Sequence, residues 1–214
     1  MTTEPVRLEI LSDPICPWCY IGKAGLDAAL ERRADHRFAV SWHPFMLNPD
    51  MPPQGMDRRE YLQAKFGPPD AVVQAYLPVQ QQAEKLGLAM DLSRIARTPA
   101  TLDAHRLIHW AGLEGAQTRV VSALFRAYFA DGRDIGSAEV LADIAAGAGM
   151  DRAAIARLLA TDADAEEVRQ ADALARSRGV RGVPCFVVAG EYVVTGAQPT
   201  AFWLQVIDEL ATRP

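Results

Sequence analysis

The chain lacks several features that would assign it to a class at once. None of its apolar runs approaches the ~20 residues of a membrane-spanning helix, although 50% of its 214 residues are hydrophobic. Basic residues are not in excess, since 22 Lys and Arg stand against 27 Asp and Glu, and no basic stripe is present for nucleic acid. The start, Met-Thr-Thr-Glu-Pro, lacks a basic segment followed by an apolar one. We therefore expect a soluble cytoplasmic protein that binds neither membrane nor nucleic acid.

Cysteine is also scarce, with 3 residues in the whole chain. That number excludes the dense disulfide framework of small secreted domains. A chain of this length can bury a core without a disulfide or metal to hold it together. Two cysteines that lie close together in a cytosolic protein are more often catalytic or metal-binding than a permanent cross-link.

The first part of the sequence has the pattern of a β-α-β unit. Residues 6–11 (V-R-L-E-I-L) and 37–45 (R-F-A-V-S-W-H-P-F) favour strands, and apolar residues recur at helical spacing between Ile21 and Arg33. Such a unit implies two parallel strands with a right-handed crossover.

The middle of the sequence indicates helices and no clear strand. Pro78 should kink or split one of them, because proline has no amide hydrogen and its ring clashes with the preceding turn. Ser137, Asp151 and Thr161 can each cap a helix start, and Gly179 is a plausible helix stop. The expected helices are 70–86, 100–113, 118–130, one from Ser137, one from Asp151 and one from Thr161 to Arg178.

The last part returns to strands. Residues 185–189 and 192–195 flank Gly190-Glu191, which indicates a hairpin, and residues 199–210 favour a closing helix. The sequence contains no internal repeat.

Cys16 and Cys19 carry the clearest chemistry. If Cys16 lies in the first turn of the helix, free amides and the helix dipole stabilise its thiolate, and a thiol pKa of ~8.5 can fall to roughly 3.5–7.5. Cys19 lies one turn deeper and is shielded, so Cys16 is expected to attack a disulfide and Cys19 to resolve the mixed disulfide. Pro17 suits a helix start, and Trp18 can form a wall beside the sulfur.

Two alternatives to redox chemistry remain open at the residue level. A closed zinc site needs four ligands, and beyond this pair the chain offers only Cys185 and four histidines. We expect no metal site. The other alternative is a pair of unreactive cysteines at a helix start.

Residues 179–188 (G-V-R-G-V-P-C-F-V-V) place a proline at the start of a strand. Such a proline must occupy an edge, a bulge or a bend, because it cannot donate to the sheet. On residue statistics alone the Val183-Pro184 bond is expected to be trans, since only about 5–6% of X-Pro bonds in folded proteins are cis.

Taken together, these segments resemble the thioredoxin-fold proteins of the DsbA type, and more narrowly the FrnE-like thiol-disulfide oxidoreductases. The resemblance spans nearly the whole chain. The segments that carry it are S-D-P-I-C-P-W-C-Y-I-G (12–22), W-H-P-F-M-L-N-P (42–49), A-H-R-L (104–107), F-R-A-Y-F-A-D-G-R-D-I (125–135), G-V-R-G-V-P-C-F-V-V (179–188) and G-A-Q-P (196–199).

The resemblance implies an α/β thioredoxin-like fold, β-α-β followed by β-β-α, with a large all-helical insertion. Residues 1–50 and 178–214 would form the discontinuous thioredoxin-like domain and residues 51–177 the helical insertion that covers the cysteines. It also implies a cis Val183-Pro184 bond that faces Cys16 and Cys19, where the main chain of Val183 pairs with an extended substrate.

Two positions depart from the family pattern. Many relatives carry a buried acid six residues before the first cysteine, and Ile10 stands there. Glu9 or Asp13 could substitute for it, and neither is favoured. Cys185 follows the proline; alternation along the strand points it away from Val183, which favours a small buried core residue over a third redox thiol.

The remaining polar candidates favour structural roles. Asp13 precedes Pro14 and is chiefly a turn residue, and His43, His105 and His109 are expected to be structural histidines with satisfied hydrogen bonds.

The predicted function is thiol-disulfide exchange, as an oxidoreductase or isomerase, on disulfides of polypeptides or low-molecular-weight thiols. It needs no bound cofactor, and glutathione is a candidate reductant. Pro17, Trp18, Val183 and Pro184 are the expected substrate-binding residues. A homodimer stays open, and so does the direction of the redox reaction.

The alternative function is a glutathione-dependent isomerase or transferase of the hydroxychromene carboxylate isomerase or kappa class. These share the inserted fold and, by resemblance, carry Ser where Cys16 stands. A third possibility is a non-catalytic binding or chaperone module that uses the groove.

Overall fold

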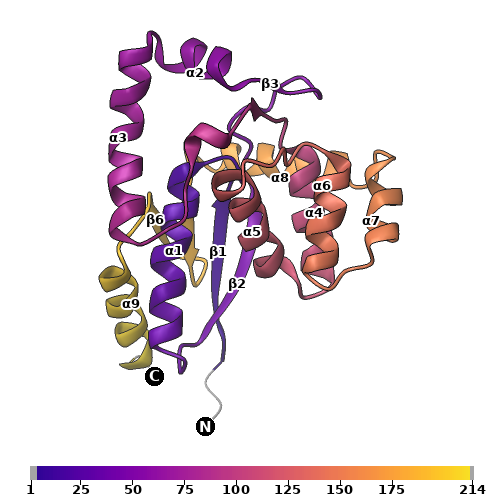
Figure 1. The fold of residues 1–214 in the computed structure, drawn as a ribbon. Coiled ribbons are helices and arrows are strands. Elements are labelled where there is room, and N and C mark those ends of the chain that lie inside the picture. The colour runs from indigo at the N-terminus through magenta and orange to yellow at the C-terminus, as the bar shows by residue number, and fades with distance from the viewer. Residues whose placement is uncertain (1–3, 213–214) are drawn as a thin grey trace.

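The computed structural model describes residues 4–212. A four-stranded sheet has the order β2-β1-β5-β6, in which β1 and β2 are parallel and the other neighbours are antiparallel. Figure 1 shows the helices that the chain builds between β2 and β5 above this sheet and to either side of it. The elements are β1 (Val6–Ser12), α1 (Pro17–Arg32), β2 (Phe38–Pro44), β3 (Met56–Asp57), α2 (Arg58–Phe66), α3 (Pro69–Lys85), the 3₁₀ turn η1 (Leu92–Arg94), β4 (Arg97–Thr98), α4 (Leu102–Leu113), α5 (Gln117–Phe125), the π-helical turn η2 (Arg126–Ala130), α6 (Ala138–Gly147), α7 (Arg152–Leu159), α8 (Ala165–Ser177), β5 (Cys185–Val188), β6 (Tyr192–Thr195) and α9 (Thr200–Thr212).

The predicted order β-α-β, helical block, β-β-α is confirmed, and it is the thioredoxin-like arrangement expected for the chain. The alternating residues of β1 explain why it lies in the middle of the sheet. Leu8 and Ile10 are buried in the cluster that contains residues of α1 and α9. Leu11 belongs instead to a smaller cluster with Cys185 of β5. β1 therefore presents apolar side chains to both faces of the sheet.

Helices α1 and α9 cover one face of the sheet and pack beside each other (Figure 1). The contact between sheet and α9 is aromatic, since the rings of Phe186 and Trp203 lie 4.8 Å apart at 64°. Trp203 is fully buried. We call the face of Leu8, Ile10 and Phe186 the front face, and the face of Glu9, Leu11 and Val187 the rear face.

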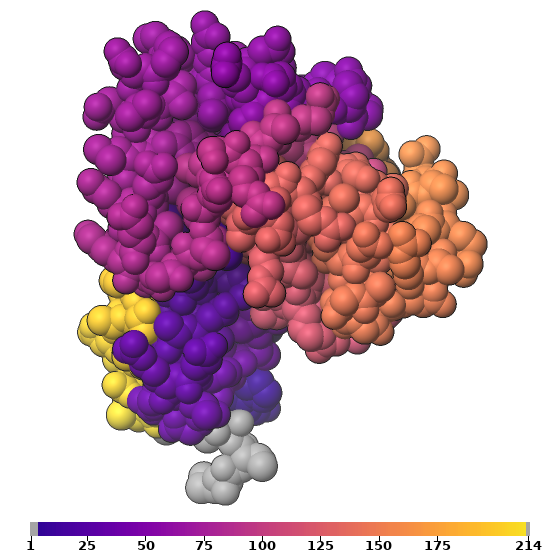
Figure 2. Space-filling model, in the orientation of Figure 1, coloured from indigo at the N-terminus to yellow at the C-terminus, as the bar shows by residue number. Residues whose placement is uncertain are grey.

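One side chain of the helical block, Gln117 of α5, pairs with the backbone at the edge of β2. The Trp42 amide donates to Gln117 Oε1 at 2.9 Å, and Gln117 Nε2 donates to the Trp42 carbonyl at 3.0 Å. The Gln117 carboxamide thus makes the two hydrogen bonds that a peptide group of a neighbouring strand would make. In Figure 2 the segment of α2 and α3 covers the upper part of the molecule, and the indigo of the first strand and helix is visible only below it.

One local prediction for the middle of the chain was wrong. Met56 and Asp57 pair with Arg97 and Thr98 in a short two-stranded sheet, where no strand was expected. The expected helix 118–130 is confirmed as α5 and η2, with π-helical geometry from Arg126 onward.

Of the two effects expected of Pro78, a split is not found, since Pro78 lies inside the continuous helix α3. Pro78 and Gln74 are both exposed, so the carbonyl of Gln74 that loses its helical partner can be hydrated.

The expected helix caps are only partly confirmed. The Asp151 carboxylate accepts from the amides of Ala153 and Ala154 at the start of α7. Ser137 precedes α6 without a side-chain cap, and α8 begins at Ala165, not at Thr161. Gly179 follows α8 with a φ of 91°, as expected for a helix stop.

The division into residues 1–50 plus 178–214 and residues 51–177 stays a prediction. One hydrophobic cluster includes Leu26 of α1 and Leu124 of α5, so the core is continuous between the two parts. Met-Thr-Thr, part of the start on which the expectation of a cytoplasmic protein rests, lies outside the described residues. Within residues 4–212, every helix is too short or too polar to cross a membrane.

Candidate active site

The two cysteines of the CPWC motif lie where β1 passes into α1. After Ser12 the chain turns so that the Cys16 amide donates to the Asp13 carbonyl at 2.9 Å. Cys16 is the residue that precedes the helix, with extended dihedral angles of −85° and 114°, and Pro17 occupies the first helical position. Proline suits this position because its missing amide hydrogen would have no helical partner there.

Cys16 and Cys19 are both free thiols, and both are shielded from solvent. Cys16 is 4% exposed and Cys19 1%. The Cys19 amide donates to the Cys16 carbonyl at 3.1 Å, which holds the two residues one turn apart. Burial, and next the neighbouring Cys16 sulfur, raise the pKa of Cys19 well above its ordinary value. Cys19 is therefore kept as a neutral thiol.

The Val183-Pro184 segment faces Cys16. Its peptide bond is cis, where residue statistics alone favoured trans, and the Cys16 thiol donates to the Val183 carbonyl with Sγ and O 3.6 Å apart. This contact joins residues 167 positions apart in the sequence. The structure therefore brings Val183 and Pro184 together with Cys16.

Gly22 is a site residue whose role the sequence analysis missed. A Cβ on Gly22 would lie 3.1 Å from Pro184 Cγ and 3.3 Å from Ala197 Cα. Only a glycine lets α1 come this close to the proline segment without displacement. The signal was present, since Gly22 ends the segment S-D-P-I-C-P-W-C-Y-I-G.

Trp18 and Pro17 lie on the outer side of the cysteine turn. The Trp18 side chain is 37% exposed, which is unusual for so large an apolar residue. Pro17 is half-buried. Trp18 thus offers an accessible aromatic surface next to the two cysteines in the chain.

Asp13 has the turn role that was predicted for it and is also fully buried. Its Oδ1 accepts from the Ile15 amide at 3.2 Å, which closes the turn before Cys16. Its Oδ2 accepts from the Leu47 amide at 2.7 Å and from the Thr101 hydroxyl at 3.5 Å. Burial raises the pKa of Asp13 to about 7 in spite of these hydrogen bonds.

The two other positions considered for a buried acid do not provide one. Ile10 lies in the apolar core at 1% exposure. Glu9 lies on the rear face, where its carboxylate is 3.9 Å from His43 Nε2. Of Glu9 and Asp13, the two acids considered, Asp13 is the one that is buried beside the CPWC motif.

Cys185 is a core residue, as predicted, but the expectation that it points away from Val183 was wrong: residues two apart on a strand share a face, and Val183 packs against the cluster that contains Cys185. It is 2% exposed and packs with Leu11, Phe45 and Ala175, and burial raises the pKa of its thiol. These properties describe a structural cysteine.

The expectation of satisfied structural histidines is wrong for His105. Its side chain is buried, but its Nε2 has no hydrogen-bond partner among the described residues, and burial lowers the pKa of the imidazole to about 4. His43 behaves as expected, with Nε2 3.1 Å from the Ser41 hydroxyl. Burial lowers the pKa of His43 as well.

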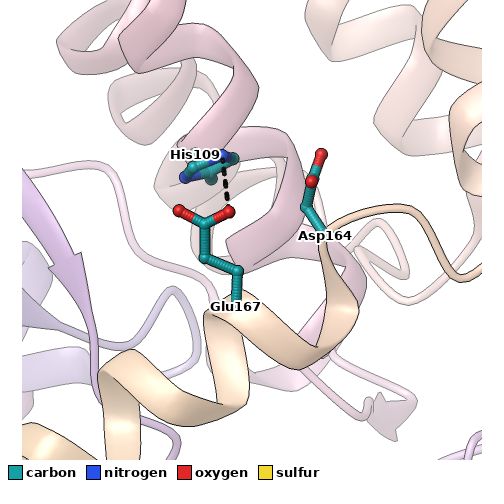
Figure 3. Close-up of side chains that lie close together, drawn as sticks. All are labelled: His109, Asp164 and Glu167. Carbon is teal, nitrogen blue, oxygen red and sulfur yellow. Dashed lines mark ion pairs between the residues drawn. The ribbon is translucent and has the colours of Figure 1, made fainter.

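His109 belongs to a different group of side chains, which Figure 3 shows between α4 and α8. Its Nε2 lies 3.9 Å from Glu167 Oε2, and possible ligand atoms of His109, Asp164 and Glu167 are all within 4.8 Å of one another. Asp164 already accepts from the Trp110 indole at 2.7 Å, and both carboxylates are exposed. Within residues 4–212 the cysteines join no such group of ligands.

The family model of the DSBA-like thioredoxin domain matches residues 7–208 of the chain. Among solved structures, the chain is similar to a probable DsbA oxidoreductase from Streptomyces coelicolor, with 34% identity, a TM-score of 0.85 and coverage of 98% of this chain and 92% of that one.

Two more distant structures share the fold. The cytosolic disulfide reductase DsbM from Pseudomonas aeruginosa is 21% identical, with a TM-score of 0.69 over 97% of this chain and 100% of that one. A 2-hydroxychromene-2-carboxylate isomerase is 15% identical, with a TM-score of 0.72 over 96% of each chain.

Proposed function

The chain belongs to the DSBA-like thioredoxin domain family, and on that premise we propose that it catalyses thiol-disulfide exchange at Cys16 and Cys19. The observation that carries the proposal is the position of Cys16. It lies at the N-terminal end of α1, one turn before a second free thiol, and its Sγ is 3.6 Å from the Val183 carbonyl.

The reaction proceeds in two exchange steps. The Cys16 thiolate attacks one sulfur of the substrate disulfide, forms a mixed disulfide and releases the other substrate sulfur as a thiolate. Cys19 then loses its proton and attacks the Cys16 sulfur, which forms the Cys16–Cys19 disulfide and releases the second substrate thiol. The substrate gains two electrons and the enzyme loses two. Because burial holds the proton on Cys19, the resolving step waits until a proton acceptor is available.

The substrate-binding roles fall to the residues around Cys16. The Val183 carbonyl accepts a hydrogen bond from an extended substrate backbone once the Cys16 thiol has ionised and no longer donates to it. Pro184 and Pro17 shape the approach to the sulfur, and the exposed ring of Trp18 provides an apolar surface for substrate side chains.

Regeneration of the dithiol requires a reductant. Two molecules of a low-molecular-weight thiol such as glutathione reduce the Cys16–Cys19 disulfide and leave as one oxidised dimer. The Pseudomonas reductase DsbM, which shares the fold, has been solved with GSH. A reduced cytoplasmic thiol pool would drive the enzyme as a reductase or isomerase by mass action.

Substitution of the cysteines tests this function. Cys16→Ser is expected to abolish insulin reduction and the reshuffling of scrambled ribonuclease, because it removes the attacking sulfur. Cys19→Ser is expected to accumulate the mixed disulfide, which mass spectrometry detects. Cys185→Ala is the matched control and retains activity, because that thiol is buried in the core. Full activity of Cys16→Ser would refute the proposal.

The glutathione-dependent isomerase alternative has less support from the site. An isomerase that only holds a glutathione thiolate has no use for a second thiol one turn away, yet Cys19 is present and free. The resemblance to the chromene isomerase is one of fold, at 15% identity.

A further inference from the structure

The rear face of the sheet bounds a large cavity, and apart from Val183 and Pro184 its lining has no role in the proposed chemistry. Its volume is about 1110 Å³. Its walls come from β1, the end of α8, the segment 178–184 and the hairpin of β5 and β6. We call it the rear cavity. A drug-sized ligand typically needs roughly 300–1,000 Å³, so the rear cavity has room for several amino-acid side chains.

Much of the rear cavity is apolar and open to solvent. Leu11 and Val187 belong to the sheet, and Leu174 of α8 faces them. Leu174 is 49% exposed and Val193 of β6 is 63% exposed. Apolar side chains that gather beside a cavity mark a binding surface more often than scattered ones do.

Two guanidinium groups give the rear cavity a charge. Arg178 and Arg181 line it and are exposed. Among residues 4–212, neither has a carboxylate partner within ion-pair distance, whereas Arg176 of the same region is bound to Asp172. The cavity lining also holds one carboxylate, Glu9, and the neighbouring His43 does not offset its charge, because burial lowers the pKa of that imidazole. Two guanidinium groups against one carboxylate leave the lining with a net positive charge, which complements carboxylates.

The rear cavity adjoins the candidate active site through Val183 and Pro184, which both line it. Val183 lines the cavity, and the Val183 carbonyl is the group that contacts the Cys16 sulfur. Arg181 precedes Val183 by two residues. Because an extended chain rises about 3.3 Å per residue, a polypeptide paired with Val183 passes Arg181 about two residues from its reactive cysteine.

We propose that the rear cavity binds the segment of a polypeptide substrate next to its reactive cysteine and selects acidic and apolar side chains there through Arg178, Arg181 and Leu174. The inference rests on the proposed function and narrows its substrate class. It favours a polypeptide with acidic residues about two to four positions from the cysteine over a small neutral disulfide, which is too small to reach the arginines.

The test compares three disulfides as oxidants of the reduced protein. The first is a peptide with Leu and two Glu beside its cysteine, the second the same peptide with Lys for Glu, and the third 2-hydroxyethyl disulfide. Second-order rates of Cys16–Cys19 oxidation are measured by acid quench and mass spectrometry. They are measured for the wild type, for the double variant Arg178→Ala/Arg181→Ala, and for the control Arg157→Ala/Arg169→Ala, which removes the same charge elsewhere.

In Arg178→Ala/Arg181→Ala, oxidation of Cys16–Cys19 by the Glu peptide is expected to be about tenfold slower, since the variant loses two partly exposed ion pairs with the peptide. The rates with the Lys peptide and with hydroxyethyl disulfide stay within about twofold of the wild type. The control pair leaves the preference for Glu over Lys unchanged. In the wild type, 0.5 M salt reduces that preference, because screening weakens exposed charge pairs.

Two outcomes overturn the inference while the proposed function stands. One is an equal effect of both double variants on all three disulfides. The other is a wild-type dimer that dissociates in Arg178→Ala/Arg181→Ala by size-exclusion chromatography, which would identify a second copy of the chain as the occupant. Failure of the wild type to react with any of the three disulfides would instead refute the proposed function itself.

Discussion

The two faces of the sheet differ in how they are covered. The front face is closed by α1 and α9, and Leu8, Ile10 and Phe186 are at most 1% exposed there. The rear face keeps a cavity of about 1110 Å³, and Val193 beside it is 63% exposed. The front face holds the cysteine helix against the sheet, which fixes Cys16 in position. The rear face contributes less to stability and leaves an accessible surface next to the same site.

The largest expected effect comes from two neighbouring residues of β5 that point to opposite faces. Phe186→Ala should lower the free energy of unfolding by about 3–5 kcal/mol, because it leaves a cavity against Trp203. Val187→Ala, on the rear face, should cost about 1 kcal/mol, since its side chain is only half-buried. Urea unfolding of both variants measures the difference, and equal losses would contradict the comparison of the two faces.

The next largest effect on stability is expected from Asp13, which directly follows the end of β1 and is fully buried. Its pKa is raised by folding from 3.8 to about 7, so the folded state binds the proton more tightly than the unfolded state. The contribution of Asp13 to stability is therefore complete below about pH 4 and is lost as pH rises to 7.

Relative to Asp13→Asn, the wild type should lose about 2–3 kcal/mol between pH 5 and pH 8. Denaturant unfolding of both proteins across this range measures it. His105 titrates in both proteins, so its effect cancels in the difference. Parallel stability curves for the two proteins would show that Asp13 keeps the same protonation state when the chain folds.

A smaller effect tests the contact between α1 and the proline segment. Gly22→Ala places a methyl group 3.1 Å from Pro184 Cγ and should cost about 1–3 kcal/mol, with slower disulfide exchange, because the Val183 carbonyl moves away from Cys16. Gly147→Ala is the control, since nothing lies within 4 Å of a Cβ there. The control should leave exchange unchanged. Wild-type exchange rates in Gly22→Ala would argue against this role for the glycine.

The smallest expected effect on stability belongs to the rear face. Leu174→Ser should change the free energy of unfolding by no more than about 0.5 kcal/mol, because the side chain is 49% exposed. The same change should slow oxidation by the Glu peptide a few-fold, since it removes apolar contact in the rear cavity. A strongly destabilised variant would mean that Leu174 belongs to the core.

The sequence predicted those parts of the fold that depend on local spacing. The period of residues 6–11, the helix after the cysteines and the hairpin around Gly190 were sufficient for the order of the core elements. In each case the deciding residues are neighbours in the chain, so the pattern alone carries the information.

The features that the sequence did not predict depend on distant contacts. Asp13 is buried by the Leu47 amide and Thr101, which are 34 and 88 residues away. The unpartnered nitrogen of His105 depends on its tertiary surroundings, and so does the rear cavity, whose walls come from β1, α8 and the terminal hairpin. The sequence could not decide whether Pro78 splits its helix, because the cost of the proline depends on whether the Gln74 carbonyl meets water, and the sequence does not report exposure.

The pairing of Gln117 with Trp42 determines where the sheet can grow. At the outer side of β2, both hydrogen-bonding groups of Trp42 are already occupied by one carboxamide. Any strand from another molecule that docked along this edge would have to displace that side chain at its centre. Gln117 therefore blocks edge-to-edge pairing at the β2 side of the sheet, and one residue at the start of a helix closes that edge.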